Sequence, residues 1–293
     1  MGRVARAGSL LLAVCAALTG ACALHTAQAV TQVNPPVADR TILINGHELR
    51  LHFSWGTPGV THPLLVYATG DGGWHRKDVA AYKHLVSAGH PTVGFDAHDY
   101  VTHLGHRDST TPARLAADYE RIIMTAKETL RLPADYPVVL VGVSRGAGLS
   151  VVAAGQRGLR PSIAGVLAVA LTKEEEYVKR LGRLRRRGRP PTGPEMVEVY
   201  DYLPRLGAMP IAVVQSTRDN YLPAAAARKL FGPDNPHRWF QPIEAGNHSF
   251  SGARPQLYEA IDRSLTWIDG LLPANHTPSS RQRDSEGARS LNR

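Results

Sequence analysis

The stretch that decides the fold is Pro137-Val138-Val139-Leu140-Val141-Gly142-Val143-Ser144-Arg145-Gly146. Its apolar first half predicts a buried strand, and residues 147–158 behind it predict a helix. A Gly-x-Ser-x-Gly sequence between a strand and a helix is typical of a nucleophile elbow, a sharp turn that exposes a serine hydroxyl. Its two glycines have no Cβ, so the strand and the helix can pass close together. Ser144 is therefore the candidate nucleophile, and an ordinary glycine-rich turn is the alternative.

A nucleophilic serine needs a histidine base and an acid that orients it, and after such an elbow the acid precedes the histidine. Residues 209–216 predict a buried strand, and Asp219 lies in the loop behind it. His248 lies in a glycine-containing loop before the last expected helix. We predict Asp219 as the acid and His248 as the base, with Asp201 and Glu244 as rival acids. Alternatively, Asp219 caps the next helix and His248 is one of thirteen histidines.

Two backbone N–H groups should stabilise the negative charge that forms on the attacked oxygen. One belongs to the residue after the nucleophile, here Arg145, and the other to a loop behind an earlier strand. That loop is Ala68-Thr69-Gly70-Asp71-Gly72-Gly73-Trp74, after the expected strand 63–67. Gly72 or Gly73 is the predicted second donor of this oxyanion hole. A common tight turn is the alternative interpretation.

Strands and helices alternate along most of the chain, which predicts an α/β fold with a mostly parallel sheet and helices on both faces. Residues 96–111 are expected to form a long loop. The expected strands are 41–44, 49–53, 63–67, 91–95, 137–141, 163–171, 209–216 and 237–243, and the expected helices are 77–88, 112–130, 147–158, 223–231 and 255–271.

The N-terminus has the layout of a secretory signal peptide. Arg3 and Arg6 precede the apolar stretch 10–18, and Ala27-Gln28-Ala29 is a small-x-small cleavage signal. The apolar stretch is too short to span a bilayer as a stable helix. We therefore expect residues 1–29 to be removed and the protein to be periplasmic or secreted. Lipoprotein processing at Cys22 is the alternative.

The rest of the chain is expected to form one domain, residues 30–273, followed by a disordered tail, residues 274–293, that is rich in Ser, Arg, Pro and Asn. The only cysteines are Cys15 and Cys22. Because both precede the expected cleavage site, the mature chain would have no disulfide and no cysteine nucleophile.

Positive charge is concentrated in one segment of a chain whose formal net charge is +9. Lysines and arginines gather in residues 179–189, within an expected arginine-rich insertion of about residues 172–206. Such a run could hold the protein at an anionic lipid surface, and a solvated loop is the alternative. Nucleic-acid binding is not expected, because no recognition motif accompanies the charge.

Histidines and acids also gather in the expected long loop, where His98, His103 and His106 lie near Asp96 and Asp99. Imidazole and carboxylate groups are suitable zinc ligands, but their spacing matches no helical His-Glu-x-x-His motif. A serine mechanism needs neither a metal nor another cofactor, so we expect none.

Several of these motifs together resemble the VirJ/AcvB family of periplasmic α/β hydrolases, over about residues 40–272. They are Gly70-Asp71-Gly72-Gly73-Trp74, the turn at 95–100 followed by Thr111-Pro112 and Asp118, the serine elbow and the late His248. The resemblance implies an α/β-hydrolase fold with Ser144 as nucleophile, His248 as base and the 70–74 loop beside the site. Four residues of these motifs are candidates for substrate binding: Asp71, Trp74, Asp96 and Tyr100. Asp71 and Asp96, like Asp99, are expected on loops at strand ends, where they could meet a cationic aminoacyl group. Caps and turn formers are the alternative interpretation of these acids.

The same resemblance implies hydrolysis of the aminoacyl ester of lysyl-phosphatidylglycerol and a link to type IV secretion. We therefore expect a serine ester hydrolase whose partners are an ester substrate, an anionic membrane lipid surface and secretion-system proteins. A general carboxylesterase on small soluble esters and a non-catalytic periplasmic adaptor are the alternatives. The chain departs from the family pattern at Gly148, where an acidic residue is expected, and in its arginine-rich segment 173–206.

Overall fold

Strand β5 (Val138–Val143) leads to the serine elbow and is buried on both sides. Val138 and Leu140 pack into one hydrophobic cluster, and Val139 and Val141 pack into another on the opposite face. This alternation explains the continuous apolar run, because a central parallel strand has no face in water. The computed structural model describes residues 39–104, 111–176 and 196–272, and it places β5 inside an eight-stranded sheet.

The sheet has the strand order β1-β2-β4-β3-β5-β6-β9-β10. β1 pairs antiparallel with β2, and β2 pairs antiparallel with β4, whereas the remaining neighbours are parallel. The carboxyl ends of the parallel strands therefore share one edge, where ligands bind in open α/β sheets. The strands are β1 (Arg40–Ile44), β2 (His47–Ser54), β3 (Leu64–Ala68), β4 (Thr92–Phe95), β5, β6 (Gly165–Val169), β9 (Ile211–Ser216) and β10 (Arg238–Ile243).

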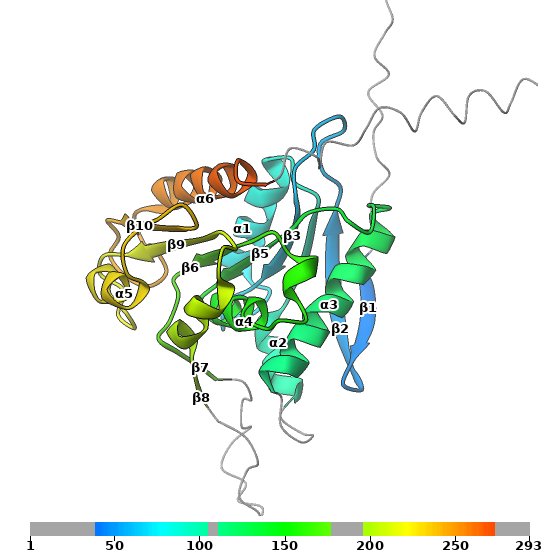
Figure 1. The fold of residues 1–293 in the computed structure, drawn as a ribbon, viewed down its shortest axis with the longest axis horizontal. Helices are drawn as coiled ribbons and strands as arrows, with labels where there is room; N and C mark the ends of the chain where they lie inside the picture. Colours follow the sequence, from blue (N-terminus) through cyan, green and yellow to red (C-terminus); the bar gives the residue numbers. More distant parts are fainter. Residues whose placement is uncertain (1–38, 105–110, 177–195, 273–293) are drawn as a thin grey trace, which may run out of the picture. The chain divides into compact units, whose positions relative to one another are not determined.

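Helices cover both faces of this sheet (Figure 1). α1 and α6 pack on one face through residues such as Leu85 and Ile261, and the other helices pack on the opposite face. The predicted α/β fold, a mostly parallel sheet covered on both faces, is thus confirmed. The helices are α1 (Arg76–Ser87), α2 (Ala97–Leu104), α3 (Pro112–Thr129), α4 (Arg145–Ala154), α5 (Ala224–Phe231), α6 (Arg254–Asp269) and the 3-10 helices η1 (Arg160–Ser162) and η2 (Val199–Leu206).

The expectation of one long loop between β4 and α3 was wrong, because α2 occupies half of it. Asp96 caps this helix, since its Oδ1 accepts the N–H of Asp99 at 2.9 Å. Ala97, Tyr100 and Val101 are buried on one side of the helix. His98 and His103 therefore lie on a helix and not in a loop.

The expected insertion, residues 172–206, was too wide at its carboxyl end. Two short strands, β7 (Glu174–Glu176) and β8 (Met196–Glu198), form an antiparallel pair. η2 follows directly, and its Val199, Leu203 and Leu206 are buried in the core. Residues 196–206 thus belong to the body of the domain.

Several predictions concern residues outside the described ranges. These are the signal peptide at 1–29, lipidation at Cys22, the basic run 179–189, His106 and the tail 274–293. The described residues belong to one compact unit within residues 33–293. Among the helices of that part, none combines the length and the apolar character that crossing a membrane requires.

Candidate active site

Ser144 occupies the sharp turn between β5 and α4. Its backbone has φ 51° and ψ −114°, a conformation that is strained for a residue with a side chain. The turn is held by the Ser144 N–H, which donates to the oxygen of Val169 at 2.8 Å. A Cβ at Gly142 would collide with the backbone of Gly146, and one at Gly146 with that of Ala68. Both glycines of the motif are therefore steric requirements of the elbow.

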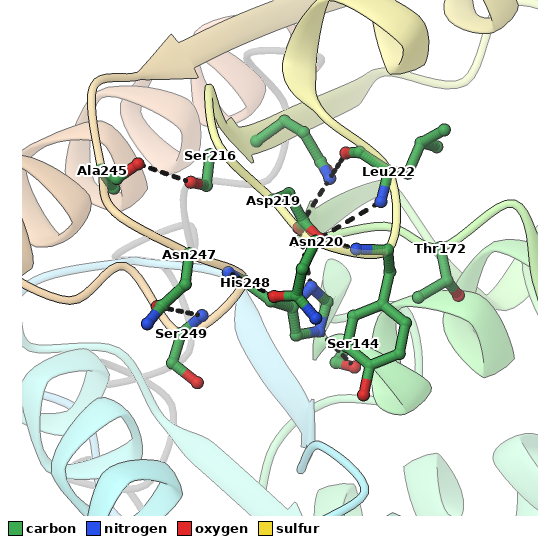
Figure 2. Close-up of polar contacts among 12 residues, drawn as sticks. Ser144, Thr172, Ser216, Asp219, Asn220, Leu222, Ala245, Asn247, His248 and Ser249 are labelled. Atoms are coloured by element: carbon green, nitrogen blue, oxygen red, sulfur yellow. Dashed lines mark hydrogen bonds and ion pairs between the residues drawn. The ribbon is translucent and has the colours of Figure 1, made fainter.

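The structure brings the three predicted residues of the triad together (Figure 2). His248 Nε2 lies 2.8 Å from Ser144 Oγ, and His248 Nδ1 lies 2.7 Å from Asp219 Oδ2. The three residues follow β5, β9 and β10, whose carboxyl ends meet at one edge of the sheet. This geometry allows the histidine to take the serine proton while the carboxylate orients its ring.

Asp219 is fully buried, and four donors surround its carboxylate. Oδ1 accepts the backbone N–H groups of Tyr221 at 2.8 Å and Leu222 at 3.2 Å. Oδ2 accepts the amide of Gln215 at 3.0 Å in addition to His248. A buried carboxylate is tolerated when hydrogen bonds replace its hydration. Sequence reasoning missed Gln215, although one glutamine in the apolar strand β9 was a usable signal.

The rival acids do not reach the histidine. Asp201 is exposed on η2. Glu244 is exposed and forms an ion pair with Arg218 at 2.7 Å. Hydrogen bonds from Arg218 and Thr217 hold the pKa of Glu244 below its usual range. The choice of Asp219 is thus supported by geometry.

The predicted oxyanion loop lies against the elbow, but Gly73 is not its donor. The N–H of Gly73 donates to the oxygen of Gly70 at 3.0 Å and closes a tight turn. A Cβ at Gly70 would lie 3.7 Å from the Cβ of Ser144, so the loop passes close to the nucleophile. Arg145 begins α4, and Gly72 is exposed in the loop. For these two residues the donor role stays a prediction.

Asp78 holds this loop from the inner side, and sequence reasoning missed it. Its Oδ1 accepts the N–H of Gly70 at 2.8 Å and the hydroxyl of Tyr67 at 3.3 Å. Burial raises the pKa of the Asp78 carboxyl, and these two donors oppose that rise. Burial also raises the pKa of Tyr67 well above its ordinary value, so the phenol stays a donor.

Three of the four predicted substrate-binding residues make structural contacts, and their role in binding stays a prediction. The Trp74 ring stacks on His52 with ring centroids 3.9 Å apart, and the backbone N–H of Trp74 donates to Asp96 Oδ2 at 2.7 Å. Asp96 also caps α2. Tyr100 is buried and donates to Asp118 at 2.8 Å, and burial raises the pKa of that carboxyl. These contacts shape the walls of the site.

The fourth, Asp71, is half exposed and lies next to the elbow. Its Oδ1 is 2.9 Å from Arg145 Nε and 3.2 Å from His98 Nδ1.

One exposed aromatic residue lies at the triad and was not predicted. The Tyr221 ring stands edge-on to His248 with centroids 4.7 Å apart, and 70% of Tyr221 is exposed.

The candidate metal ligands are paired with acids rather than with one another. His98 contacts Asp71, and His103 Nδ1 lies 2.8 Å from Asp99 Oδ1. Within residues 39–104, 111–176 and 196–272, no group of three histidine or acidic side chains is arranged to hold a metal ion.

Comparisons with known proteins agree with this architecture. Residues 63–180 match the family model described as bacterial virulence protein (VirJ). No curated protein matches the chain.

Solved structures share the fold at low sequence identity. Est1E from Butyrivibrio proteoclasticus is 15% identical, with a TM-score of 0.56 over 78% of this chain and 98% of that chain. A soluble variant of monoglyceride lipase from Saccharomyces cerevisiae is 13% identical, with a TM-score of 0.55 over 83% and 98%. XC6422 from Xanthomonas campestris, described as an α/β serine hydrolase without lid, is 14% identical, with a TM-score of 0.52 over 82% and 99%. The chain therefore has an α/β-hydrolase fold, and its residues 63–180 are similar to the VirJ family.

Proposed function

We propose that this protein is a serine ester hydrolase that cleaves the aminoacyl ester of lysyl-phosphatidylglycerol-type lipids. The observation that carries the proposal is the unbroken hydrogen-bond chain from Ser144 Oγ through both ring nitrogens of His248 to Asp219. A protein that only binds partners has no need to align these three groups.

The geometry supports a two-step reaction. Ser144 Oγ attacks the ester carbonyl carbon while His248 Nε2 accepts the hydroxyl proton, and Asp219 stabilises the imidazolium. The carbonyl oxygen becomes negative and is held by backbone N–H groups, for which Arg145 and Gly72 are the candidates. The leaving alcohol takes the proton from His248. Water then attacks the acyl-enzyme with His248 as base, which releases the acid and restores Ser144.

Two observations support a phospholipid as substrate. The first is the match of residues 63–180 to the VirJ family. The second is a cationic cluster, which we define as Arg76, Lys77 and Arg254, lining one surface cavity of about 350 Å³. Within the described part of the chain these three side chains form no ion pair. The negatively charged phosphate group of a lipid would form ion pairs with these side chains.

The cationic cluster lies at the ends of two loops that border the site. Arg76 and Lys77 begin α1, directly after the 70–74 loop, and Arg254 begins α6, six residues after His248. Both loops lie at the carboxyl edge of the sheet. A lipid phosphate held by the cluster would therefore keep the ester of the same molecule near Ser144. The N-terminal signal-peptide pattern supports a periplasmic or secreted location, where such lipids are accessible.

Labelling with a fluorophosphonate probe tests the proposed function. The purified protein should be labelled at Ser144, and vesicles that contain lysyl-phosphatidylglycerol should slow the labelling more than vesicles of phosphatidylglycerol alone. Equal protection by both vesicles together with fast turnover of soluble esters would favour the general carboxylesterase. Absence of labelling would favour the non-catalytic adaptor and contradict the proposal.

Neutralising the cationic cluster should affect lipid and soluble substrates differently. In the triple variant Arg76→Gln, Lys77→Gln and Arg254→Gln, hydrolysis of lysyl-phosphatidylglycerol carried in vesicles of excess phosphatidylglycerol should fall by at least about 10-fold. Each cation near such an anionic surface contributes up to about 1 kcal/mol. Turnover of p-nitrophenyl acetate should stay unchanged. The loss should shrink at high salt, which screens the attraction.

A charge-matched control variant replaces three exposed cations elsewhere, Arg131, Arg157 and Lys229, with Gln. This variant should hydrolyse the lipid at nearly the wild-type rate. Equal losses in the two triple variants would show that only net charge matters, and would contradict a specific role of the cluster.

A further inference from the structure

The side chain of Arg145, the residue directly after the nucleophile, is a buried cation. Only 8% of it is exposed. Its Nε lies 2.9 Å from Asp71 Oδ1, and one of its terminal nitrogens lies 3.1 Å from Glu175 Oε1. Burial of a guanidinium is unfavourable unless carboxylates pair with it. In this protein one carboxylate lies on each side of the Arg145 guanidinium.

The two carboxylates belong to opposite walls of the site. Asp71 lies in the loop after β3, and Glu175 lies in β7, which follows β6. Thr172 supports the second wall, because its hydroxyl donates to Glu175 Oε2 at 3.1 Å. Arg145 therefore ties the glycine-rich loop and the β7 segment to the start of α4.

Gly148 makes room for this arrangement. A Cβ at this position would lie 3.0 Å from Cγ and 3.2 Å from Oε2 of Glu175. A side chain at position 148 would require Glu175 to shift by a few tenths of an ångström. At Gly148 the chain lacks the acidic residue that the family pattern predicts, and the structure offers a steric explanation. The carboxylate of Glu175 lies where the side chain of residue 148 would lie.

We propose that the Arg145 side chain is a positioning residue that clamps the 70–73 loop against the serine elbow. Asp78 holds the loop at the Gly70 N–H from the inner side, and Arg145 holds it at the Asp71 carboxylate from the outer side. Three glycines give this loop more backbone freedom than other residues would, so its position depends on such contacts. N–H groups stabilise an oxyanion only when they are preorganised around the position where the charge develops. For its kinetic consequences, the inference rests on the proposed hydrolase function.

Asp71→Ala tests the clamp with little risk to folding, because Asp71 is half exposed and Arg145 keeps Glu175 as a partner. We expect kcat for p-nitrophenyl acetate to fall by about 10- to 100-fold, less than the ~10²–10³ measured when a donor is removed outright. KM should change little, since the loop acts on the transition state. Arg145→Lys should show the same pattern, because lysine lacks the planar fork that bridges two carboxylates.

A matched control removes an Arg–Asp ion pair elsewhere in the fold. Arg228 and Asp234 lie 2.7 Å apart between α5 and β10. Asp234→Ala should leave kcat and KM at wild-type values. Binding of a phenylboronic acid, which forms a tetrahedral adduct at the serine, should weaken in Asp71→Ala by the factor that kcat/KM loses. A purely structural role would not produce this correlation.

Hydrogen exchange tests the clamp without any catalytic readout. The amides of residues 69–75 should exchange about 10-fold faster in Asp71→Ala and Arg145→Lys than in wild type, and at the wild-type rate in Asp234→Ala. Unchanged exchange in this loop would overturn the clamp, even in an active enzyme. A wild-type protein that fluorophosphonate does not label would instead overturn the proposed function, and the exchange result would still decide the clamp.

Discussion

Replacing Ser144 with alanine is expected to abolish ester hydrolysis, with kcat reduced by at least ~10³-fold, because residues of a triad act as a unit. The Ser144 oxygen is the atom that forms the acyl-enzyme, and no described side chain other than His248 is hydrogen-bonded to it. Alanine keeps the Cβ that the strained elbow already accommodates, so the fold should survive. Turnover of p-nitrophenyl acetate and labelling by a fluorophosphonate probe measure the effect.

Ser249→Ala is the matched control for this experiment. Ser249 is exposed beside His248 and lies on the same loop (Figure 2). Its loss should leave turnover and labelling intact, and thermal unfolding should be unchanged in both variants. Retained turnover in a Ser144→Ala preparation that contains no wild-type protein would contradict the proposed nucleophile.

Asp219→Asn should reduce kcat by about 10⁴-fold, the size of effect found when a triad carboxylate becomes an amide. In the native site the two oxygens accept four donors. An Asn oxygen that keeps the N–H groups of Tyr221 and Leu222 would turn its NH2 toward the amide of Gln215 and Nδ1 of His248. His248 would then accept at Nδ1 and carry its proton on Nε2, where it can no longer take the serine proton.

The rival acids provide the controls for Asp219. Asp201→Asn and Glu244→Gln should retain wild-type kcat, because neither carboxylate reaches His248 in the structure. An Asp219→Asn variant with more than a tenth of wild-type activity and a normal thermal unfolding temperature would show that another group orients the histidine.

The sequence by itself predicted a mostly parallel sheet and a serine elbow. It also singled out Ser144, Asp219 and His248, which the structure places within hydrogen-bonding distance of one another. Runs of four to six apolar residues between helical patterns indicate buried strands of a covered sheet, because they are too short for typical helices. The elbow glycines signal a close approach of strand and helix, which the structure shows at Gly142 and Gly146. The order serine, acid, histidine then selects Asp219 and His248 from loops that a parallel sheet brings to one edge.

The sequence predicts secondary structure least well in short segments that contain polar residues. The sequence predicts a loop where α2 lies, because its eight residues contain two histidines and an aspartate and show little apolar periodicity. Its buried side is defined only once Tyr100 meets Asp118 of α3. The sequence likewise shows no clear apolar periodicity in η2 and places it in an insertion, although its apolar residues complete the core.

The partners of the site residues were decided by the tertiary structure alone. Gln215 holds Asp219, Asp78 holds Gly70, and Arg145 bridges two carboxylates that lie 74 and 30 positions from it in the chain. The sequence shows that such side chains carry charge, and it does not show which charges meet. Which charged groups meet depends on how strands from distant parts of the chain align their carboxyl ends. The three triad residues could be predicted because they follow a motif. The contacts that hold them in place could not, because no motif records them.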